Sequence, residues 1–424
     1  MKLQMMLFAS LAAFFCVVPT ARPQQLSPPA DQPVKLADLV AEAERTHPAL
    51  QAAAGLVEAK RARIPQARAL PDPQLSVGYM GDFAPFRTQA GDPSSYRQFG
   101  LMQELPYPGK RELRGKIAAK DVDAEKWNLE AARRRIRAEV ALAYYELFAV
   151  DKALEITQAN KELLEKLARI AEERYKVGKG LQQDVIRAQV EVSRVLQRQT
   201  VLGQRRRTLE AQLNSLLVRP PASPIGPLAP VQKAVFAYSL EELLQKAVDN
   251  FPEIRRQEQL IEQSQLAVNL ARKNYYPDFS VGWDYQNRPD FLEMYGLRFT
   301  MNLPIFYKSK QRQAVGEASA NLAAARHERE AVRTALFFQV KEQYLMAKAS
   351  EELLNLYSKA IVPQSTLALE SGLAAYQVGS LDFLSLLSSF SNVLDYEISY
   401  YAELANFQKA LARLEEITGI ELTK

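Results

Sequence analysis

The chain contains almost none of the residues on which many active sites depend. Among its 424 residues there is one cysteine, Cys16, and there are two histidines, His47 and His327. Zinc sites draw on Cys and His ligands, and thiol or triad catalysis needs a nucleophile beside a base. This inventory therefore argues against a zinc site, a cysteine nucleophile and a histidine-based triad.

Long hydrophobic runs and a charge of one sign are also missing. After the first 20 positions no apolar run reaches 18 residues, which excludes a polytopic α-helical membrane protein. The 54 Lys and Arg residues against 49 Asp and Glu give a net charge of +5, spread evenly along the chain. A nucleic-acid-binding protein concentrates its positive charge on a stripe or a tail, so we expect no nucleic-acid partner.

The N-terminus has the pattern of an export signal. Lys2 precedes an apolar stretch over residues 7–18, and a polar, proline-rich segment follows, so residues 1–21 are predicted to be a secretory signal peptide. Cys16 raises the alternative of a lipoprotein, but no small residue directly precedes it. Residues 22–35 are predicted to be an extended arm that orders on docking. The exported chain would then fold without disulfides.

The sequence is an internal duplication. Pro48 and Pro252 lie 204 positions apart (252 − 48), and so do Pro73 and Pro277. Further matches join the following segments: Leu105-Pro106 with Leu303-Pro304, and Tyr175-Lys-Val-Gly178 with Tyr376-Gln-Val-Gly379. We expect repeat 1 over 36–218, a proline-rich linker over 219–239, and repeat 2 over 240–424.

Each repeat is predicted to contain two amphipathic strands, at about 73–83 and 96–105 and again at about 277–287 and 295–304. Apolar and polar residues alternate in them, most clearly in the second repeat. Glu104, Asp284 and Arg298 fall on the polar face and would face the lumen of a barrel. The alternative is a pair of soluble hairpins with one face on a core.

Long helices account for most of the remainder. From Lys110 to about Tyr175 there is no proline, and apolar residues recur at steps of three and four, the pattern of a coiled-coil seam. Such a helix would be about 100 Å long. Returning helices are expected from Asp184 to Leu217 and, in the second repeat, from Asp382 to Gly419, after an outgoing helix over 311–376.

Together these elements predict a mostly α protein with a β-barrel portion. Four strands cannot close a barrel, and an open sheet in lipid would leave its edge groups unpaired. A homotrimer would supply 12 strands, and it would also gather the long helices into an α-helical tube. The barrel would contact outer-membrane lipid.

The residues also resemble a known family, the TolC-like outer-membrane efflux proteins. The most specific segments are Gln103-Glu-Leu-Pro-Tyr-Pro-Gly-Lys110, residues 175–189 and residues 376–387. The resemblance covers both repeats. It implies a passive exit duct in the outer membrane of a Gram-negative bacterium that extends into the periplasm. Its partners would be a periplasmic adaptor and an inner-membrane transporter of the resistance-nodulation-division (RND) type, with the heavy-metal branch favoured. It also implies no enzyme activity and no cofactor.

The turns between outgoing and returning helices, at 177–184 and 378–382, are the expected periplasmic tips. The resemblance places adaptor docking there, at Gly178, Asp184, Gly379 and Leu381. The structural alternative is that the glycines end helices with positive φ, and that Asp184 caps the next helix and interacts favourably with its dipole. The two interpretations are compatible.

Two further residues are candidates for gating. Three copies of Asp382 would form a carboxylate ring at the periplasmic aperture, although a helix cap is the simpler role and Ser385 stands where better-known members of the family carry a further Asp. Pro363 interrupts an outgoing helix whose counterpart in repeat 1 has no proline. It is therefore predicted to be a hinge.

Other functions remain as alternatives. Methionines in the strands could suggest copper, but Met commonly fills gaps in cores, so no metal site is expected. A periplasmic adaptor or an exported structural coiled coil without a pore are the competing classes. The duplicated hairpin and the presence of only 17 glycines argue against an adaptor. The sequence does not identify the exported compound.

Overall fold

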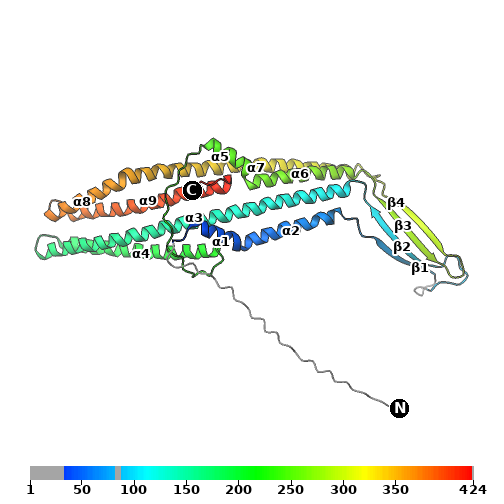
Figure 1. Ribbon diagram of the computed structural model, residues 1–424, viewed down its shortest axis with the longest axis horizontal. Coiled ribbons are helices and arrows are strands. Elements are labelled where there is room, and N and C mark those ends of the chain that lie inside the picture. Colours follow the sequence, from blue (N-terminus) through cyan, green and yellow to red (C-terminus); the bar gives the residue numbers. More distant parts are fainter. Residues whose placement is uncertain (1–32, 82–86, 423–424) are drawn as a thin grey trace, which may run out of the picture.

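The computed structural model describes residues 33–81 and 87–422, so the predicted signal peptide and most of the predicted arm lie outside the described residues. The molecule is elongated. Long helices run along its axis and a four-stranded sheet lies at one end, with the turns α3–α4 and α8–α9 at the other (Figure 1).

The two halves have the same order of elements. The first contains α1 (Leu36–Thr46), α2 (Pro48–Arg68), β1 (Gln74–Met80), β2 (Tyr96–Leu105), α3 (Lys110–Lys176) and α4 (Gln182–Leu216). The second contains α5 (Leu240–Asn250), α6 (Pro252–Lys273), β3 (Phe279–Asn287), β4 (Met294–Met301), α7 (Gln311–Leu356), the π-helical turn η1 (Tyr357–Ile361), α8 (Val362–Val378) and α9 (Phe383–Thr418).

Helix α3 is unbroken over 67 residues, as expected for a segment without proline. It begins after Gly109, whose φ of 85° allows the chain to turn sharply out of β2. Its apolar seam is buried, with Val140 and Leu147 fully enclosed. The helix packs against α4, α6, α2 and α9, so it connects the two repeats along most of the molecule.

The core consists of three apolar clusters, two of them side by side in the middle of the molecule, one in each repeat, and the third at the tips. One joins α1, α3 and α4 through residues such as Leu39, Leu147 and Leu213. Another joins α5, α7 and α9. The third lies at the tips and joins α3, α4, α8 and α9, with Phe383 and Phe390 fully buried. Just before α1, the Val34 amide donates a hydrogen bond to the Pro227 carbonyl (2.9 Å), so the end of the predicted arm contacts the linker.

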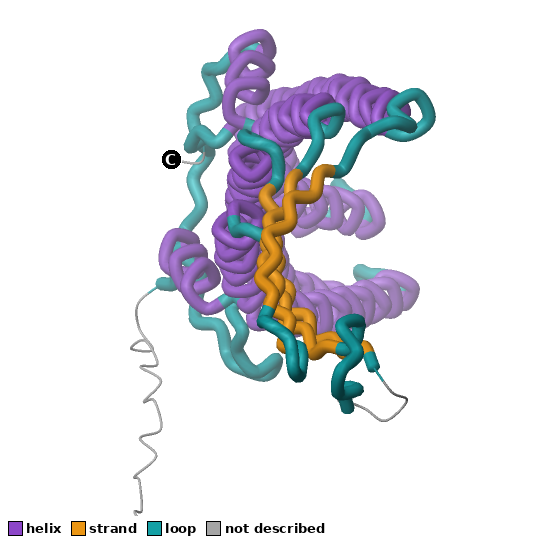
Figure 2. The backbone as a smooth tube through the Cα atoms, turned by 90° about the vertical axis from the view of Figure 1, so that its right-hand side faces the viewer, coloured by secondary structure: helices purple, strands orange, loops and turns teal. Residues whose placement is uncertain are grey.

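The strands form one antiparallel sheet in the order β1-β2-β3-β4. Viewed from the strand end, the helices make a curved, C-shaped layer and the sheet curves across it (Figure 2). The strands β1, β3 and β4 are shorter than their predicted spans, and β2 has the predicted bounds. No helix among the described residues has the length and apolar character needed to cross a membrane.

Candidate channel surface and helical tips

The register of the sheet places the three candidate lumen residues on one face. Residues directly opposite each other in a ladder point to the same side of the sheet. Glu104 lies opposite Ser280, Asp284 lies opposite Gly100 and Gly296, and Arg298 lies opposite Gly282. Even-numbered residues of all four strands therefore share this face, which carries most of the polar side chains of the sheet.

Asp284 and Arg298 are brought together, whereas Glu104 is not. The Gln98 side-chain amide donates to Asp284 Oδ1 (3.0 Å), and Arg298 Nη2 lies 3.3 Å from Asp284 Oδ2. A Cβ at Gly100 would lie 2.6 Å from Asp284 Oδ1, so only glycine leaves room for this carboxylate. Glu104 lies four positions further along β2 than Gly100, outside this group.

The opposite face of the sheet is apolar and exposed. Odd-numbered residues make up this face, and the exposed apolar ones are Leu75, Val77, Phe99, Leu101, Leu105, Val281, Trp283, Tyr295, Leu297, Phe299 and Met301. Aromatic rings stack along it, as Phe279 and Phe299 do at 5.6 Å between centroids. An apolar outer band over a polar inner face is the pattern of a strand that separates lipid from water.

The two tip turns share one backbone motif. Gly178 has φ 71° and Gly379 has φ 83°, the left-handed conformation expected of glycine after a helix. At the first tip, Lys179 N donates to Arg174 O (2.8 Å) and Gly178 N donates to Tyr175 O (2.9 Å). At the second, Ser380 N and Gly379 N make the equivalent bonds to Ala375 O and Tyr376 O. These are Schellman motifs. They let each helix end and the chain reverse direction within only four or five residues.

The two tip aspartates differ. Asp382 is the N-cap of α9: Oδ1 accepts from Ser385 N (3.0 Å), and the Ser385 hydroxyl donates to Oδ2 (2.6 Å). The Ser385 hydroxyl, and then its backbone amide, lower the pKa of Asp382. The expected cap at Asp184 is wrong, because α4 starts two residues earlier, after Leu181, and no side chain caps it. Asp184 lies in the first turn of α4, where its negative charge interacts favourably with the helix dipole, as the other part of that expectation had it.

Leu381, the remaining docking candidate, is partly buried against the tip cluster. Its side chain lies near Gly372, whose added Cβ would be 3.4 Å from Leu381 Cδ2. By contrast, a Cβ at Gly178 would meet no atom within 4 Å. At the first tip, the backbone at Gly178 is therefore accessible to a partner. At the second tip, the Leu381 side chain is already packed against the chain's own core.

Pro363 lies in the first turn of α8, directly after the π-helical turn. There the Val362 amide donates to the Tyr357 carbonyl, an i→i−5 bond. Proline has no amide hydrogen and its ring crowds the preceding turn, and a π turn is a usual way to absorb that conflict inside a helix. The interruption expected from the sequence is present, and it extends over the residues before the proline.

Sequence reasoning missed Arg174. This residue near the end of α3 reaches across to α8, where its guanidinium donates to the Tyr376 carbonyl and lies 4.7 Å from the centroid of the Tyr376 ring. An arginine in the last turn of a helix is common, so no sequence signal singles it out.

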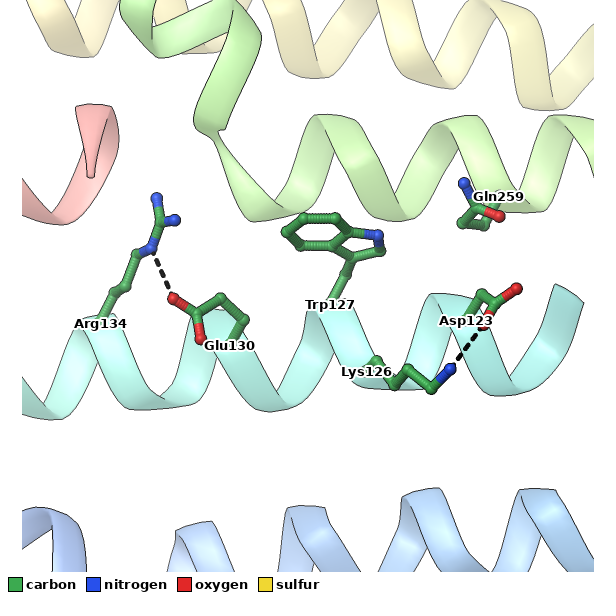
Figure 3. A pocket seen from close by; sticks show the side chains of 6 residues that line it. All are labelled: Asp123, Lys126, Trp127, Glu130, Arg134 and Gln259. Atoms are coloured by element: carbon green, nitrogen blue, oxygen red, sulfur yellow. Dashed lines mark hydrogen bonds and ion pairs between the residues drawn. The ribbon is translucent and has the colours of Figure 1, made fainter. Parts of the chain in front are cut away.

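An open pocket lies between α3 and α6 (Figure 3). It is lined by Asp123, Lys126, Trp127, Glu130, Arg134 and Gln259. Its charges are largely satisfied within α3, since Lys126 pairs with Asp123 (2.8 Å) and Arg134 with Glu130 (3.0 Å). Over the residues that the structure describes, no three His, Cys, Asp or Glu side chains converge as a metal site would require.

Comparison with known proteins identifies the family. The outer membrane efflux protein family matches residues 39–218 and 243–420, one segment in each half. The chain belongs to this family. The family prediction from the sequence is thereby confirmed, together with an efflux function at the outer membrane.

Individual relatives are distant in sequence and close in fold. The cobalt-zinc-cadmium resistance protein CzcC of Cupriavidus metallidurans is 23% identical over 380 residues, 87% of this chain and 86% of that protein. The outer membrane protein VceC of Vibrio cholerae superposes with a TM-score of 0.77 at 18% identity, over 91% of this chain and 96% of that one. The CmeC outer membrane channel of Campylobacter jejuni gives a TM-score of 0.76 at 15% identity, over 92% and 87%. The predicted fold, a long helical body with a strand portion at one end, is confirmed.

Proposed function

We propose that three copies of this chain form the exit duct of a tripartite efflux system. In this duct the strands line an outer-membrane pore and the helices form a tube through the periplasm. The observation that carries the proposal is the sheet: its register sorts polar and apolar residues onto opposite faces, and β1 and β4 each pair on one side only among the described residues. Such a sheet satisfies its backbone in lipid only when it closes with other copies.

A periplasmic adaptor and an RND-type inner-membrane pump would complete the system. The tips are the end of the molecule furthest from the sheet, which suits docking to an adaptor (Figure 1). Because the duct has no energy source of its own, transport would be driven by the pump. Asp382 would line the periplasmic aperture, and Pro363 would let α8 and α9 move.

The experiment is fractionation followed by electrophysiology. The duct predicts a protein in the outer-membrane fraction, a trimer in detergent that dissociates on heating, and conductance in planar bilayers. A monomer in the periplasmic fraction that forms no channels would contradict it and favour an adaptor or a structural coiled coil.

For the cargo, we propose divalent metal cations. The support is the 23% identity to a cobalt-zinc-cadmium resistance protein. The test is growth of a deletion strain on graded cobalt, zinc and cadmium, with and without the wild-type gene. Equal tolerance of both strains to all three metals, with a difference for organic drugs, would contradict a metal cargo.

A further inference from the structure

Positive charge gathers where the helices meet the sheet. Helices α2 and α6 end at this boundary and α3 and α7 begin there, and each packs on the next in the order α2, α3, α6, α7 (Figure 1). We refer to six cations at the ends of α2 and α6 and at the start of α7 as the basic collar: Arg68, Arg272, Lys273, Lys308, Lys310 and Arg312. All are exposed in the single chain except Lys273, which is half-buried.

Acidic residues at the boundary neutralise little of this charge. Asp278 pairs with Lys110 (2.9 Å) and Glu112 pairs with Lys116 (2.6 Å), and neither of these lysines belongs to the collar. Asp72, exposed after α2, could offset one charge of the six. Over the described part of the chain, no collar side chain forms an ion pair. The collar therefore keeps an excess of positive charge.

Helix stability does not account for the cations of α7. The N-terminus of a helix is the positive end of its dipole, which favours acidic residues. The first turn of α7 contains no acidic residue, and Lys308, Lys310 and Arg312 lie at this end instead. By contrast, Arg272 and Lys273 lie in the last turn of α6, where the dipole favours cations. The three cations of α7 are thus unfavourable within the chain, and an anionic partner would make them favourable.

The collar adjoins the apolar face of the sheet. Beyond the end of β4 the chain continues through Leu303, Ile305 and Phe306, and the last two are exposed by 71% and 76%. Lys308 follows directly after this apolar segment and Tyr307. Long cationic side chains at the edge of an apolar surface lie along it with their stems and hold the charge in a polar layer. The apolar band of the sheet therefore ends in a basic one.

Tyrosine rings lie at the same level. The Tyr275 and Tyr307 ring centroids are 6.4 Å apart, and both side chains are exposed. Tyr107 stacks on Tyr276 at 4.5 Å, and Lys273 Nζ lies 5.7 Å from the centroid of the Tyr107 ring. Aromatic residues form girdles where the apolar band of a membrane barrel meets the lipid head groups. The collar is therefore at the depth where lipid phosphates are expected.

We propose that the basic collar binds the phosphate groups of anionic phospholipids in the periplasmic leaflet of the outer membrane. The inference rests on the proposed duct, because it requires the apolar face of the sheet to lie in lipid. The helices extend into the periplasm from this end of the sheet, so the collar meets the periplasmic leaflet rather than the outer one. Lys and Arg residues close to a membrane surface attract anionic head groups.

Tryptophan fluorescence can measure this lipid preference. The chain has two tryptophans, and Trp283 is the one exposed on the apolar face of the sheet. In a Trp127→Phe background, trimers reconstituted in phosphatidylcholine with brominated chains should lose Trp283 fluorescence, since bromine quenches on contact. Unbrominated phosphatidylglycerol should restore it at lower mole fractions than unbrominated phosphatidylcholine. The expected ratio of affinities is about fivefold for each collar cation that meets a head group. Added salt should reduce this ratio by screening the charges.

Variants assign the preference to the collar. Arg272→Gln/Lys308→Gln/Lys310→Gln/Arg312→Gln should bind both lipids equally. The matched control removes four exposed cations that lie away from the sheet and have no ion pair among the described residues, and it should keep the preference: Arg45→Gln/Lys166→Gln/Arg169→Gln/Lys341→Gln. Arg272→Lys/Arg312→Lys conserves the charge and should also keep it.

The outcomes separate this inference from the duct itself. Equal affinity of the wild type for the two lipids, or a preference that persists in the fourfold collar variant, would overturn the collar as a lipid site and leave the duct intact. If the fourfold variant does not insert, Arg272→Gln/Arg312→Gln and Lys308→Gln/Lys310→Gln are measured separately, and an undiminished preference in both has the same meaning. Absence of Trp283 quenching in wild-type trimers would instead show that the sheet does not face lipid, against the proposed duct.

Discussion

Arg174 near the end of α3 contacts both the backbone and the ring of Tyr376 near the end of α8. Its guanidinium donates to the Tyr376 carbonyl and lies over the Tyr376 ring, 4.7 Å from the centroid. The ring is buried against Phe383, and this burial raises the pKa of Tyr376. One side chain of repeat 1 therefore holds the last turn of the outgoing helix of repeat 2, at the end of the molecule where the proposed aperture lies.

Removing the Arg174–Tyr376 contact should make the turn between α8 and α9 more mobile. Arg174→Gln loses a charge-assisted hydrogen bond and a cation–π contact, together about 1–3 kcal/mol. We expect faster hydrogen exchange over residues 374–386 and unchanged exchange in the sheet. Arg169→Gln, an exposed arginine on the same helix, is the control and should leave the tip unaffected. Equal exchange in both variants would show that the contact does not hold the tips together.

Val218, two residues after the end of α4, has a strained backbone conformation. Its φ is 59°, a conformation that a β-branched residue rarely adopts, and its counterpart at the end of α9 is Gly419 with φ 69°. Val218→Gly should relieve about 1 kcal/mol of strain and raise the melting temperature in detergent. Gly419→Val should lower it, because an added Cβ would also lie 2.8 Å from Arg134 Nη1. A lower melting temperature for Val218→Gly would contradict this account.

Periodicity and repeats were sufficient to predict the architecture. The alternation around Val281 fixed which face of β3 is apolar, and the proline-free stretch after Lys110 predicted α3, because both signals depend only on local spacing. The start of α4 was misplaced, since an aspartate in the first turn of a helix resembles a cap. The contact between Arg174 and Tyr376 was missed because the two residues are 202 positions apart in the sequence. Their proximity depends on how the helices pack at the tips, which local spacing does not reveal.

Insertion should depend on the apolar face of the sheet. Val281 belongs to this face, and Val281→Arg would place a charge toward lipid at a cost of about 2–4 kcal/mol per subunit near the bilayer centre. We expect fewer trimers in the outer membrane. Asp284→Asn is the matched control on the polar face, where the amide can still accept from Gln98. Normal assembly of Val281→Arg alongside failure of Asp284→Asn would mean that the faces are assigned the wrong way round.

Asp382 allows charge and capping to be separated. Asn caps a helix about as well as Asp, so Asp382→Asn should keep the tip folded and remove only the charge, whereas Asp382→Ala should also expose the first turn of α9. In planar bilayers, Asp382→Asn should lose part of the wild-type cation preference.

The pH dependence of this preference has a definite sign. The pKa of Asp382 is lowered by the Ser385 hydroxyl and amide, so the carboxylate stays charged below the usual value of about 3.9. Both the charge and its stabilising bonds are present above the ordinary pKa and are lost as the pH falls through the lowered one. Wild-type selectivity should therefore approach that of Asp382→Asn as the pH falls through the pKa of the assembled ring, which repulsion among the three carboxylates would raise above that of the single chain. Identical selectivity of the two proteins at pH 7 would remove Asp382 from the aperture.

The π turn before Pro363 gives the hinge its physical basis. In η1 the Val362 amide donates to the Tyr357 carbonyl, and the next residue, Pro363, has no amide to donate. Pro363→Ala supplies that donor and removes the crowding ring, so the segment should relax toward regular α-helix and become stiffer. We expect slower hydrogen exchange over residues 357–366 and reduced efflux by assembled pumps, with trimer stability unchanged. The outgoing helix of repeat 1 has no such interruption, so its exchange serves as an internal reference. Exchange and efflux equal to wild type in Pro363→Ala would show that the turn is a static irregularity rather than a hinge.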